Sequence, residues 1–260
     1  MNDSNLIALL TDFGTKDYFV GAMKGAILSI NPNVNIVDIT HDIEPQNIAA
    51  ASFTLRACYA DFPPKTIFVA VVDPGVGSHR QAILVETDDY HFIAPDNGLL
   101  SFVFDEESSC KVFELTNKQY FAEKVGATFH GRDVFAPVAA HLSKGTAANL
   151  FGARTENYVR FQEIKPHPID ENRTEAAIIH ADRFGNLITN LTGGDLPENF
   201  ALEINGTTIN KRCNFFAEAA EGELFMIVGS AGFLEIVAFR DSAQQLLNVA
   251  VGQRIVVTNS

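Results

Sequence analysis

The chain has 260 residues, 47% of them hydrophobic, which is enough to bury a sizeable core and excludes a disordered or fibrous protein. Its 32 acidic and 19 basic side chains give a formal charge of -13. This charge repels phosphate backbones and anionic membrane surfaces, so we expect neither a nucleic-acid nor a membrane partner. A cationic ligand would be attracted, although many acidic proteins are simply soluble.

Cysteine usage and the first apolar run indicate the compartment. Three cysteines are too few for a disulfide framework or a tetrahedral zinc site, and they form no CxxC pair: Cys58, Cys110 and Cys213. The apolar run 6–10 is short and lacks a basic leader, so it is interpreted as a strand and not as a signal peptide. No stretch is apolar enough over a sufficient length to span a bilayer. We therefore expect a cytoplasmic protein.

Strand-like and helix-like runs alternate over the first two-thirds of the chain, which predicts βαβ units and a mainly parallel sheet. The predicted strands are Asn5 to Leu10, Val34 to Ile39, Thr66 to Val72, Ala82 to Glu86 and Lys111 to Leu115. Apolar residues recur three or four apart in the predicted helices, which are 18–30, 45–59 and 131–143. The fold class expected for this part is α/β.

The alternating pattern breaks near residues 164–172, around Pro166 and Pro168. This break predicts an N-terminal α/β domain over 1–165 and a C-terminal domain over 172–260. The later strand candidates are short, and we place them at 176–180, 186–191, 201–204, 224–228, 233–239 and 254–258, with one helix at 242–248. Their spacing favours a small antiparallel barrel or sandwich.

Polar residues directly after apolar runs are the first candidates for a site, because ligands in open α/β sheets bind beyond the carboxyl ends of the strands. Asp12 follows the first run, and its carboxylate could accept hydrogen bonds from a ribose diol. On its own, however, Asp12 is better explained as a turn or cap residue.

The loop from Asp73 to Arg80 is a more specific signal. Pro74 pushes Asp73 toward an extended conformation, while Gly75 and Gly77 let the backbone come close to a ligand. Because neither GxGxxG nor GxxxxGK[ST] is present, a tight structural turn is as well supported as an anion loop. Asp73 and Arg80 could together hold a polar nucleophile between a carboxylate and a guanidinium.

His130, between Phe129 and Gly131, could orient water or accept a proton as a neutral imidazole, although a lone histidine is more often structural. The histidines show no HExxH spacing, and we expect no metal site. In the second part, 182–186 is well explained as a turn between two strands whose backbone Asp and Asn stabilise. The small residues of 228–235 either make a bulge or let a ligand approach, and nothing local decides between these.

Five motifs in order along the chain give the most specific signal. They are Leu10-Thr11-Asp12-Phe13-Gly14, Val72-Asp73-Pro74-Gly75-Val76-Gly77, Ala94-Pro95-Asp96-Asn97-Gly98-Leu99, Phe129-His130-Gly131-Arg132-Asp133 and Asp182-Arg183-Phe184-Gly185-Asn186. With these motifs the chain resembles the S-adenosylmethionine hydroxide adenosyltransferase family, whose superfamily includes fluorinating and chlorinating enzymes.

The resemblance implies an N-terminal α/β domain, a C-terminal β-barrel, and a homotrimer whose ligand lies between subunits. It implies hydrolysis of S-adenosylmethionine to adenosine and methionine, with water attacking the ribose C5′ carbon and no cofactor. Asp73, Arg80 and His130 would form the catalytic, water-handling triad. The implied substrate-binding residues are Asp12 for the ribose diol, Asp182 for the methionine ammonium, Asn186 for adenine, Ser230 for the methionine carboxylate, and Asp17, Phe129 and Phe184 for the pocket walls.

Departures from the halogenases favour water as the nucleophile. The halogenases resemble this chain but carry tyrosine where Asp73 stands and serine where Gly131 stands, and a carboxylate at position 73 would repel a halide. Attack beside a sulfonium neutralises charge, so a dry pocket favours it without a metal. Ala231 replaces a halogenase arginine, which leaves open how the methionine carboxylate is neutralised.

Two alternatives remain open from the sequence. One is a metal-dependent phosphoesterase in which Asp12, Asp42, Asp73 and His130 gather two cations near strand ends. The other is a non-catalytic nucleoside- or S-adenosylmethionine-binding protein, in which the same pocket holds ligand while water is kept out of line.

Overall fold

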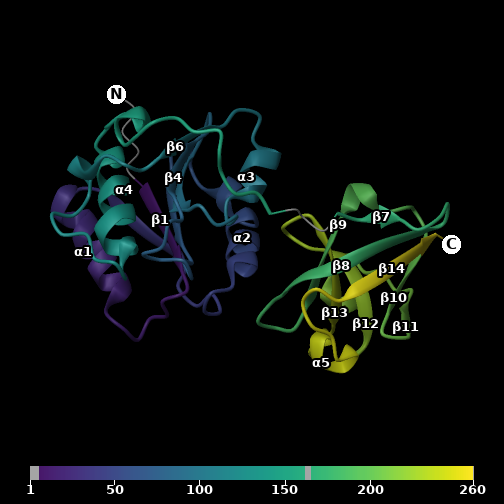
Figure 1. The fold of residues 1–260 in the computed structure, drawn as a ribbon. Coiled ribbons are helices and arrows are strands. Elements are labelled where there is room, and N and C mark those ends of the chain that lie inside the picture. Colours follow the sequence, from purple (N-terminus) through teal and green to yellow (C-terminus); the bar gives the residue numbers. More distant parts are fainter. Residues whose placement is uncertain (1–5, 162–164, 260) are drawn as a thin grey trace. The chain divides into compact units, whose positions relative to one another are not determined.

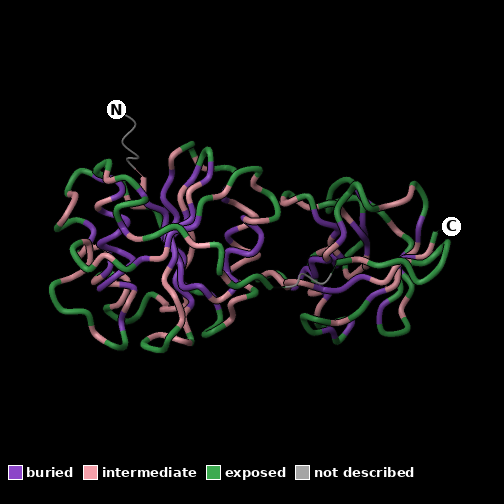
Figure 2. Tube along the Cα trace, turned by 45° about the horizontal axis from the view of Figure 1, so that its top comes forward, coloured by how far each residue is buried: buried purple, intermediate pink, exposed green. Residues whose placement is uncertain are grey.

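The computed structural model describes residues 6–161 and 165–259, and the chain divides into two compact units, Met1–Phe161 and Gln162–Ser260 (Figure 1). Asn5, the first residue of a predicted strand, and Ile164, at the start of the predicted boundary, lie outside the described residues. Buried residues gather inside each unit and exposed ones in its loops (Figure 2).

Within residues 6–161, the N-terminal unit contains a six-stranded sheet in the order β2-β1-β3-β5-β4-β6. The strands are β1 (Leu6–Thr11), β2 (Asn35–Thr40), β3 (Ile67–Val71), β4 (Ala82–Glu86), β5 (His91–Pro95) and β6 (Lys111–Glu114). The strands β2, β1, β3 and β5 pair in parallel, whereas β4 is antiparallel to both β5 and β6. The predicted α/β class with a mainly parallel sheet is therefore confirmed.

Helices cover both faces of this sheet: α1 (Phe19–Ile30) and α4 (Ala136–Ser143) lie on one side, α2 (Ile48–Arg56) and α3 (Ser101–Glu106) on the other (Figure 1). Successive strand residues point to opposite faces, so Leu9 packs with Met23 of α1 while Leu10 packs with Leu55 of α2. Burial on both faces is why the inner strands β1 and β3 read as continuous apolar runs. Single 3-10 turns are η1 (Tyr59–Asp61), η2 (Lys118–Tyr120) and η4 (Ala148–Leu150).

The helix predicted over 131–143 consists of two parts. A π-helical turn, η3 (Gly131–Phe135), comes first and α4 follows. Pro137 has no N–H with which to reach the carbonyl of Asp133, and the amide of Ala122 donates to that carbonyl instead at 2.8 Å. The π-helical turn therefore starts beside His130, and such turns occur frequently at functional sites.

Within residues 165–259, the C-terminal unit is an antiparallel, barrel-like sheet in the order β11-β10-β14-β8-β9-β13-β12, with β7 paired to β8. Its strands are β7 (His167–Pro168), β8 (Arg173–Ala181), β9 (Leu187–Thr192), β10 (Phe200–Ile204), β11 (Thr207–Ile209), β12 (Leu224–Val228), β13 (Phe233–Ala238) and β14 (Arg254–Asn259). A bridge between Arg212 and Met226 brings the segment after β11 beside β12 and nearly closes the sheet. The predicted antiparallel barrel is confirmed.

The remaining elements of this unit are short: α5 (Ala243–Leu247), η5 (Gly193–Asp195) and η6 (Phe216–Glu218). Ser242 caps α5 by accepting from the amide of Gln245, and Asn248 ends it in the left-handed conformation with φ 49°. Across the described parts of both units, no helix combines the length and apolar character needed to cross a membrane.

Candidate active site

Two neighbouring parallel strands place the first two candidate loops at one edge of the N-terminal sheet. Thr11 at the end of β1 pairs in register with Val71 at the end of β3. Asp12 and Asp73, which follow these strands, therefore lie at the carboxyl edge, where ligands bind in such sheets.

Arg80 connects the other two residues of the candidate triad, Asp73 and His130. Its Nε donates to both carboxylate oxygens of Asp73, at 2.9 Å and 3.1 Å, and its Nη2 contacts Oδ2 of the same carboxylate. Nη2 also lies 2.9 Å from Nδ1 of His130. The side chains of Asp73 and Arg80 are only 6% and 11% exposed. The structure thus brings Asp73, Arg80 and His130 into one partly buried network.

The contact with Arg80 fixes the state of His130. A guanidinium has donors and no acceptor, so Nδ1 of His130 must accept, and the neutral ring carries its proton on Nε2. Burial lowers the pKa of His130, the charge of Arg80 lowers it further, and Asp73 and Asp133 oppose this only in part. His130 is therefore neutral at neutral pH.

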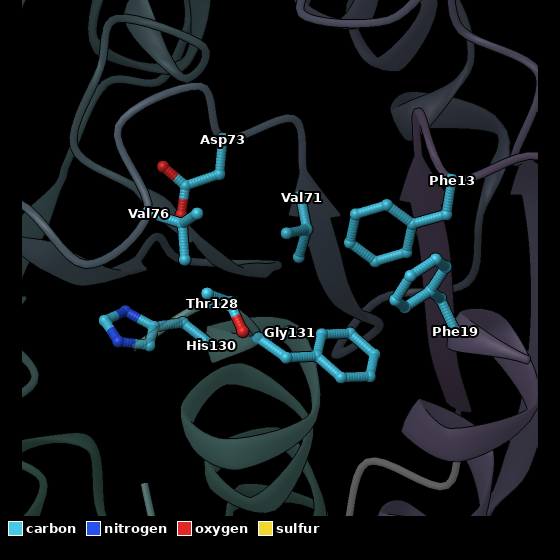
Figure 3. Close-up of a pocket in the computed structure, with 9 residues that line it drawn as sticks. Phe13, Phe19, Val71, Asp73, Val76, Thr128, His130 and Gly131 are labelled. Carbon is cyan, nitrogen blue, oxygen red and sulfur yellow. The ribbon is translucent and has the colours of Figure 1, made fainter. Parts of the chain in front are cut away.

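A small pocket opens beside this network (Figure 3). It measures about 150 Å³, and Asp73 and His130 stand on one side while Phe13 and Phe19 stand opposite. The complete lining is Phe13, Phe19, Val71, Asp73, Val76, Thr128, Phe129, His130 and Gly131. Because liquid water takes roughly 30 Å³ per molecule, the pocket has room for a few waters or a small part of a substrate, below the ~300–1,000 Å³ typical of whole ligands.

Aromatic rings form the apolar wall of this pocket. The Phe129 ring packs edge-on against Phe13 and Phe19, with centroids 5.8 Å and 5.2 Å away. Gly131 makes this packing possible, since a Cβ there would lie 3.1 Å from Sδ of Met23 and 3.2 Å from the Phe129 ring. A serine at position 131 would need these neighbours to move.

Two further residues fix the loop that leads to His130. Asp133 is 1% exposed, and it accepts hydrogen bonds from the amide of Gly126 at 2.8 Å and from Nε of Arg132 at 2.6 Å. Gly77 has φ 77°, and a Cβ there would lie 2.3 Å from the carbonyl oxygen of Ala127. The loop bearing Asp73 and the loop before His130 therefore touch through a glycine.

The two other acidic candidates of this unit differ in their surroundings. Asp12 is half-buried, and its Oδ2 accepts from the amide of Gln46 at 2.8 Å, which fixes the carboxylate near the strand end. Asp17 is exposed and is not among the described residues that line the pocket. The geometry thus supports a binding role for Asp12 more directly than for Asp17.

In the C-terminal unit, Asp182 organises the turn before β9. Its Oδ1 accepts from the amides of Phe184 and Asn186 at 2.8 Å and 2.9 Å, and its Oδ2 accepts from Nδ2 of Asn186 at 2.8 Å. The structural interpretation of this turn thus holds. Gly185, with φ 82°, would place a Cβ 2.1 Å from Oγ of Ser242, so only glycine fits.

This turn also presents side chains to a second, larger pocket, of about 600 Å³. The Phe184 ring is 77% exposed, an uncommon position for a large apolar side chain in a tight turn. The pocket is lined by Phe184, Asn186, Phe216, Ala238, Phe239, Arg240 and Asp241. Phe184 and Asn186, which the resemblance assigns to substrate, therefore share one pocket.

Ser230 lies exposed in the turn between β12 and β13 and is not among the described residues lining either pocket. In this turn the side chain of Glu235 packs against Gly229, where a Cβ would lie 1.8 Å from Oε1. Burial raises the pKa of Glu235, and the charge of Asp182 raises it further.

Sequence reasoning missed several lining residues: Phe13, Phe19, Val71, Val76 and Thr128 in one pocket, and Phe216, Phe239 and Arg240 in the other. Phe13, Val76 and Thr128 stand in or beside motifs already singled out, so their position was a usable signal. Phe19 and Phe216 have no local signal that separates them from core residues.

The arrangement around Asp73 does not favour the two-cation alternative. Among residues 6–161 and 165–259, no group of three or more His, Cys, Asp or Glu side chains is placed to hold a metal ion. Asp73, the carboxylate central to that alternative, is paired with Arg80 instead.

Comparison with known proteins bears on the whole length of the chain. Residues 7–152 match the SAM hydroxide adenosyltransferase N-terminal domain, and residues 176–256 match the C-terminal domain of the same family. The (R)-S-adenosyl-L-methionine hydrolase of Methanocaldococcus jannaschii is 36% identical over 259 residues, covering 94% of this chain and 92% of that protein.

Two further matches place the chain within a wider group. A fluorinase from Actinoplanes sp. is 26% identical, covering 100% of this chain and 99% of that protein. The crystal structure of an uncharacterized conserved protein from Thermotoga maritima superimposes with a TM-score of 0.90 at 37% identity, covering 97% of this chain and 100% of that one. The chain belongs to the SAM hydroxide adenosyltransferase family.

Proposed function

We propose that this protein hydrolyses S-adenosyl-L-methionine to adenosine and L-methionine, with water attacking the ribose C5′ carbon. The observation that carries the proposal is the Asp73–Arg80–His130 network at the side of a small, aromatic-walled pocket. The name of the M. jannaschii relative supports the substrate, and its (R) prefix points to the (R) diastereomer.

The reaction balances without a cofactor. An O–C5′ bond forms, the C5′–S bond breaks, and its electron pair neutralises the sulfonium as methionine leaves. The leaving sulfur therefore needs no proton, while the attacking water must lose one. Because charge disappears at sulfur in the transition state, the apolar walls formed by Phe13, Phe19 and Phe129 favour the reaction.

Asp73 is the proton acceptor in this proposal. Nδ1 of His130 already accepts from Arg80, so its lone pair is not free for water, whereas the carboxylate of Asp73 lines the pocket. Arg80 holds that carboxylate in one orientation through a bidentate pair of hydrogen bonds, from Nε to Oδ1 and from Nη2 to Oδ2. His130 lines the same pocket, and its Nε2–H would orient the water for attack.

The pocket beside Asp73 is too small for the whole substrate, so other residues must bind the rest of it. We assign the ribose diol to Asp12 and the adenine to the pocket that contains Phe184 and Asn186. Three of the four lone pairs of Asp182 are used in its turn, which leaves one for the methionine ammonium.

The remaining assignments rest on the resemblance alone. Ser230 would contact the methionine carboxylate, and Asp17 would lie at the edge of the site. The protein would act without a metal or other cofactor, in the cytoplasm, as a homotrimer that binds its ligand between subunits. Sedimentation equilibrium tests the trimer directly, since monomer and trimer masses differ threefold.

Incubation of the purified protein with each sulfonium diastereomer in the presence of a chelator tests the function. We expect adenosine and methionine in equal amounts from the (R) form and none with Asp73→Ala. Loss of this activity on chelation would show that a metal ion takes part and would contradict the metal-free reaction. Tight adenosine binding without turnover, unchanged in Asp73→Ala, would favour a binding protein.

A further inference from the structure

A buried histidine outside the proposed triad lies directly beneath the loop that carries Asp12. His41, directly after β2, is 4% exposed, and its Nδ1 lies 2.9 Å from Oγ1 of Thr11, which is fully buried. On the other side of the ring, Nε2 lies 3.0 Å from Oδ1 of Asp38. Asp38 in turn pairs with Lys24 at 2.6 Å.

The hydrogen-bond direction in this network follows from its chemistry. The amide of Phe13 donates to Oγ1 of Thr11 at 3.2 Å, so the hydroxyl has its own proton left to donate. A carboxylate only accepts, so Asp38 favours a proton on Nε2 of His41, the nitrogen that faces it, although that contact is too poorly aligned to count as a hydrogen bond. Nδ1 of His41 is then the acceptor for Thr11.

Asp38 stays ionised in this setting. Burial raises its pKa, but the hydrogen bond from Lys24 and the proximity of the Lys24 and His41 side chains outweigh burial and lower it overall. The order Asp38, His41, Thr11 matches the acid, base and hydroxyl of a hydrolytic triad. Thr11 is nevertheless 0% exposed at the end of a central strand, so its hydroxyl cannot reach a substrate, and a nucleophilic role is excluded.

The same network holds the backbone that leads into the site. The amide of Gly14 donates to the carbonyl of His41 at 2.7 Å, while Thr11 holds the amide of Phe13. Asp12 lies between Thr11 and Gly14, the two residues that bond to His41, and its carboxylate accepts from the amide of Gln46. Phe13, held by Thr11, then forms part of the pocket wall opposite Asp73 (Figure 3).

We propose that His41 is a positioning residue for substrate binding. Its Nδ1 accepts from the hydroxyl of Thr11, and its backbone carbonyl accepts from the amide of Gly14. These two hydrogen bonds fix the backbone from Thr11 to Gly14 and so set the positions of Asp12 and Phe13. The role in binding rests on the proposed function, because it takes Asp12 as the ligand of the ribose diol. His41 itself touches neither water nor substrate in this arrangement.

Four variants test this inference. Thr11→Val removes the hydroxyl at nearly constant shape, Thr11→Ser restores it, and His41→Ala removes the acceptor. His91→Ala is the matched control, because His91 is another largely buried histidine on the same sheet, in β5, with an acidic neighbour in Glu86. The readouts are the Kd of adenosine by calorimetry, kcat and KM with S-adenosylmethionine, and hydrogen exchange of amides 12–16.

Thr11→Val and His41→Ala should each raise the adenosine Kd and the KM about tenfold, the equivalent of one well-placed hydrogen bond, while kcat changes less than about threefold. Thr11→Ser should restore both constants. Amides 12–16 should exchange faster in Thr11→Val and His41→Ala, and at the wild-type rate in His91→Ala even if its Tm falls.

Unchanged exchange in Thr11→Val and His41→Ala would overturn the inference, and so would a kcat loss as large as the rise in KM. Hydrogen exchange needs neither ligand nor turnover, so this result is independent of the proposed function. If the wild-type protein neither binds adenosine nor cleaves S-adenosylmethionine, the proposed function fails, while faster exchange confined to Thr11→Val and His41→Ala would still establish the positioning of the loop.

Discussion

Nη2 of Arg80 donates to Nδ1 of His130 across 2.9 Å, which links the loop after β3 to the residue just before the π-helical turn. The contact has a chemical consequence, because a histidine that accepts from a guanidinium must be neutral at that nitrogen. The basic group facing the pocket is then the carboxylate of Asp73, and His130 is left as a donor.

The first prediction concerns pH. Burial and then the charge of Arg80 lower the pKa of His130 below its ordinary value of 6.5, so the ring gains a proton only in more acidic solution. That proton would break the hydrogen bond from Arg80 and place two cations side by side. The acidic limb of the kcat profile should therefore lie below pH 6.5, and it should shift or disappear in His130→Gln.

The lowered pKa of His130 also makes the free energy of unfolding depend on pH. The folded-state pKa of His130 lies below that of the unfolded chain, so the unfolded state binds more protons near pH 6.5 and below. The stabilising contribution of neutral His130 is present above pH 6.5 and is lost as the pH falls. For the kcat–pH profile, an acidic limb above pH 6.5 in the wild-type protein, or the same acidic limb in His130→Gln, would contradict the assignment of a neutral His130.

Replacing either partner of the Asp73–Arg80 pair should reduce catalysis more than binding. Asp73→Asn and Arg80→Ala should each lower kcat by about 10²–10⁴-fold, the usual range for loss of a proton-transfer group, with KM changed far less. Arg56→Ala removes a comparable Arg–carboxylate contact, to Glu106, away from this site and should leave kcat unchanged. Equal losses in kcat and in affinity would mean that the pair binds substrate.

Asp12 should act on binding alone. Asp12→Ala removes the carboxylate that Gln46 fixes and should weaken adenosine and S-adenosylmethionine alike, by about tenfold or more for a charged hydrogen-bond acceptor. Asp42→Ala, at an exposed aspartate just after β2, is the control. Calorimetry with adenosine measures both, and wild-type affinity in Asp12→Ala would remove Asp12 from the ribose role.

Gly77 should control the spacing of the two site loops. Gly77→Ala would force a Cβ to within 2.3 Å of the carbonyl of Ala127 at φ 77°, and should destabilise the fold by about 1–3 kcal/mol and lower kcat. Gly21→Ala in α1 meets no atom within 4 Å and should be neutral or stabilising by up to about 1 kcal/mol. Thermal unfolding and turnover of both variants check this, and similar behaviour would argue against the contact.

The strands were predictable where apolar runs were long and buried on both faces. The run that ends at Leu10 is β1, and Leu224–Val228 is β12 with the predicted bounds. β5 and α3 were not predicted, because β5 has only three apolar residues between His91 and Pro95, and the six residues of α3 make less than two helical turns. β5 returns directly from β4 through a turn closed by Thr87 and Tyr90, a link too short for a parallel crossover.

The candidate site was predictable where motifs ended strands and not where packing alone decides. Asp73 and Arg80 share one loop, whereas His130 lies 50 residues beyond Arg80, and only the fold brings its ring to the guanidinium. Phe19 looks like any apolar helix residue, so its place in the pocket wall depends on how α1 packs against η3. The catalytic and binding roles themselves stay predictions.

Turnover of S-adenosylmethionine in ¹⁸O-labelled water, with a chelator present and Asp73→Ala in parallel, tests the proposed chemistry most directly. We predict that wild-type protein places one ¹⁸O atom in the 5′-hydroxyl of adenosine, with one methionine released per adenosine, and that Asp73→Ala forms neither product. Adenosine without the label, cleavage at another bond of the sulfonium, or equal turnover by Asp73→Ala would contradict attack of water at C5′ under the control of Asp73.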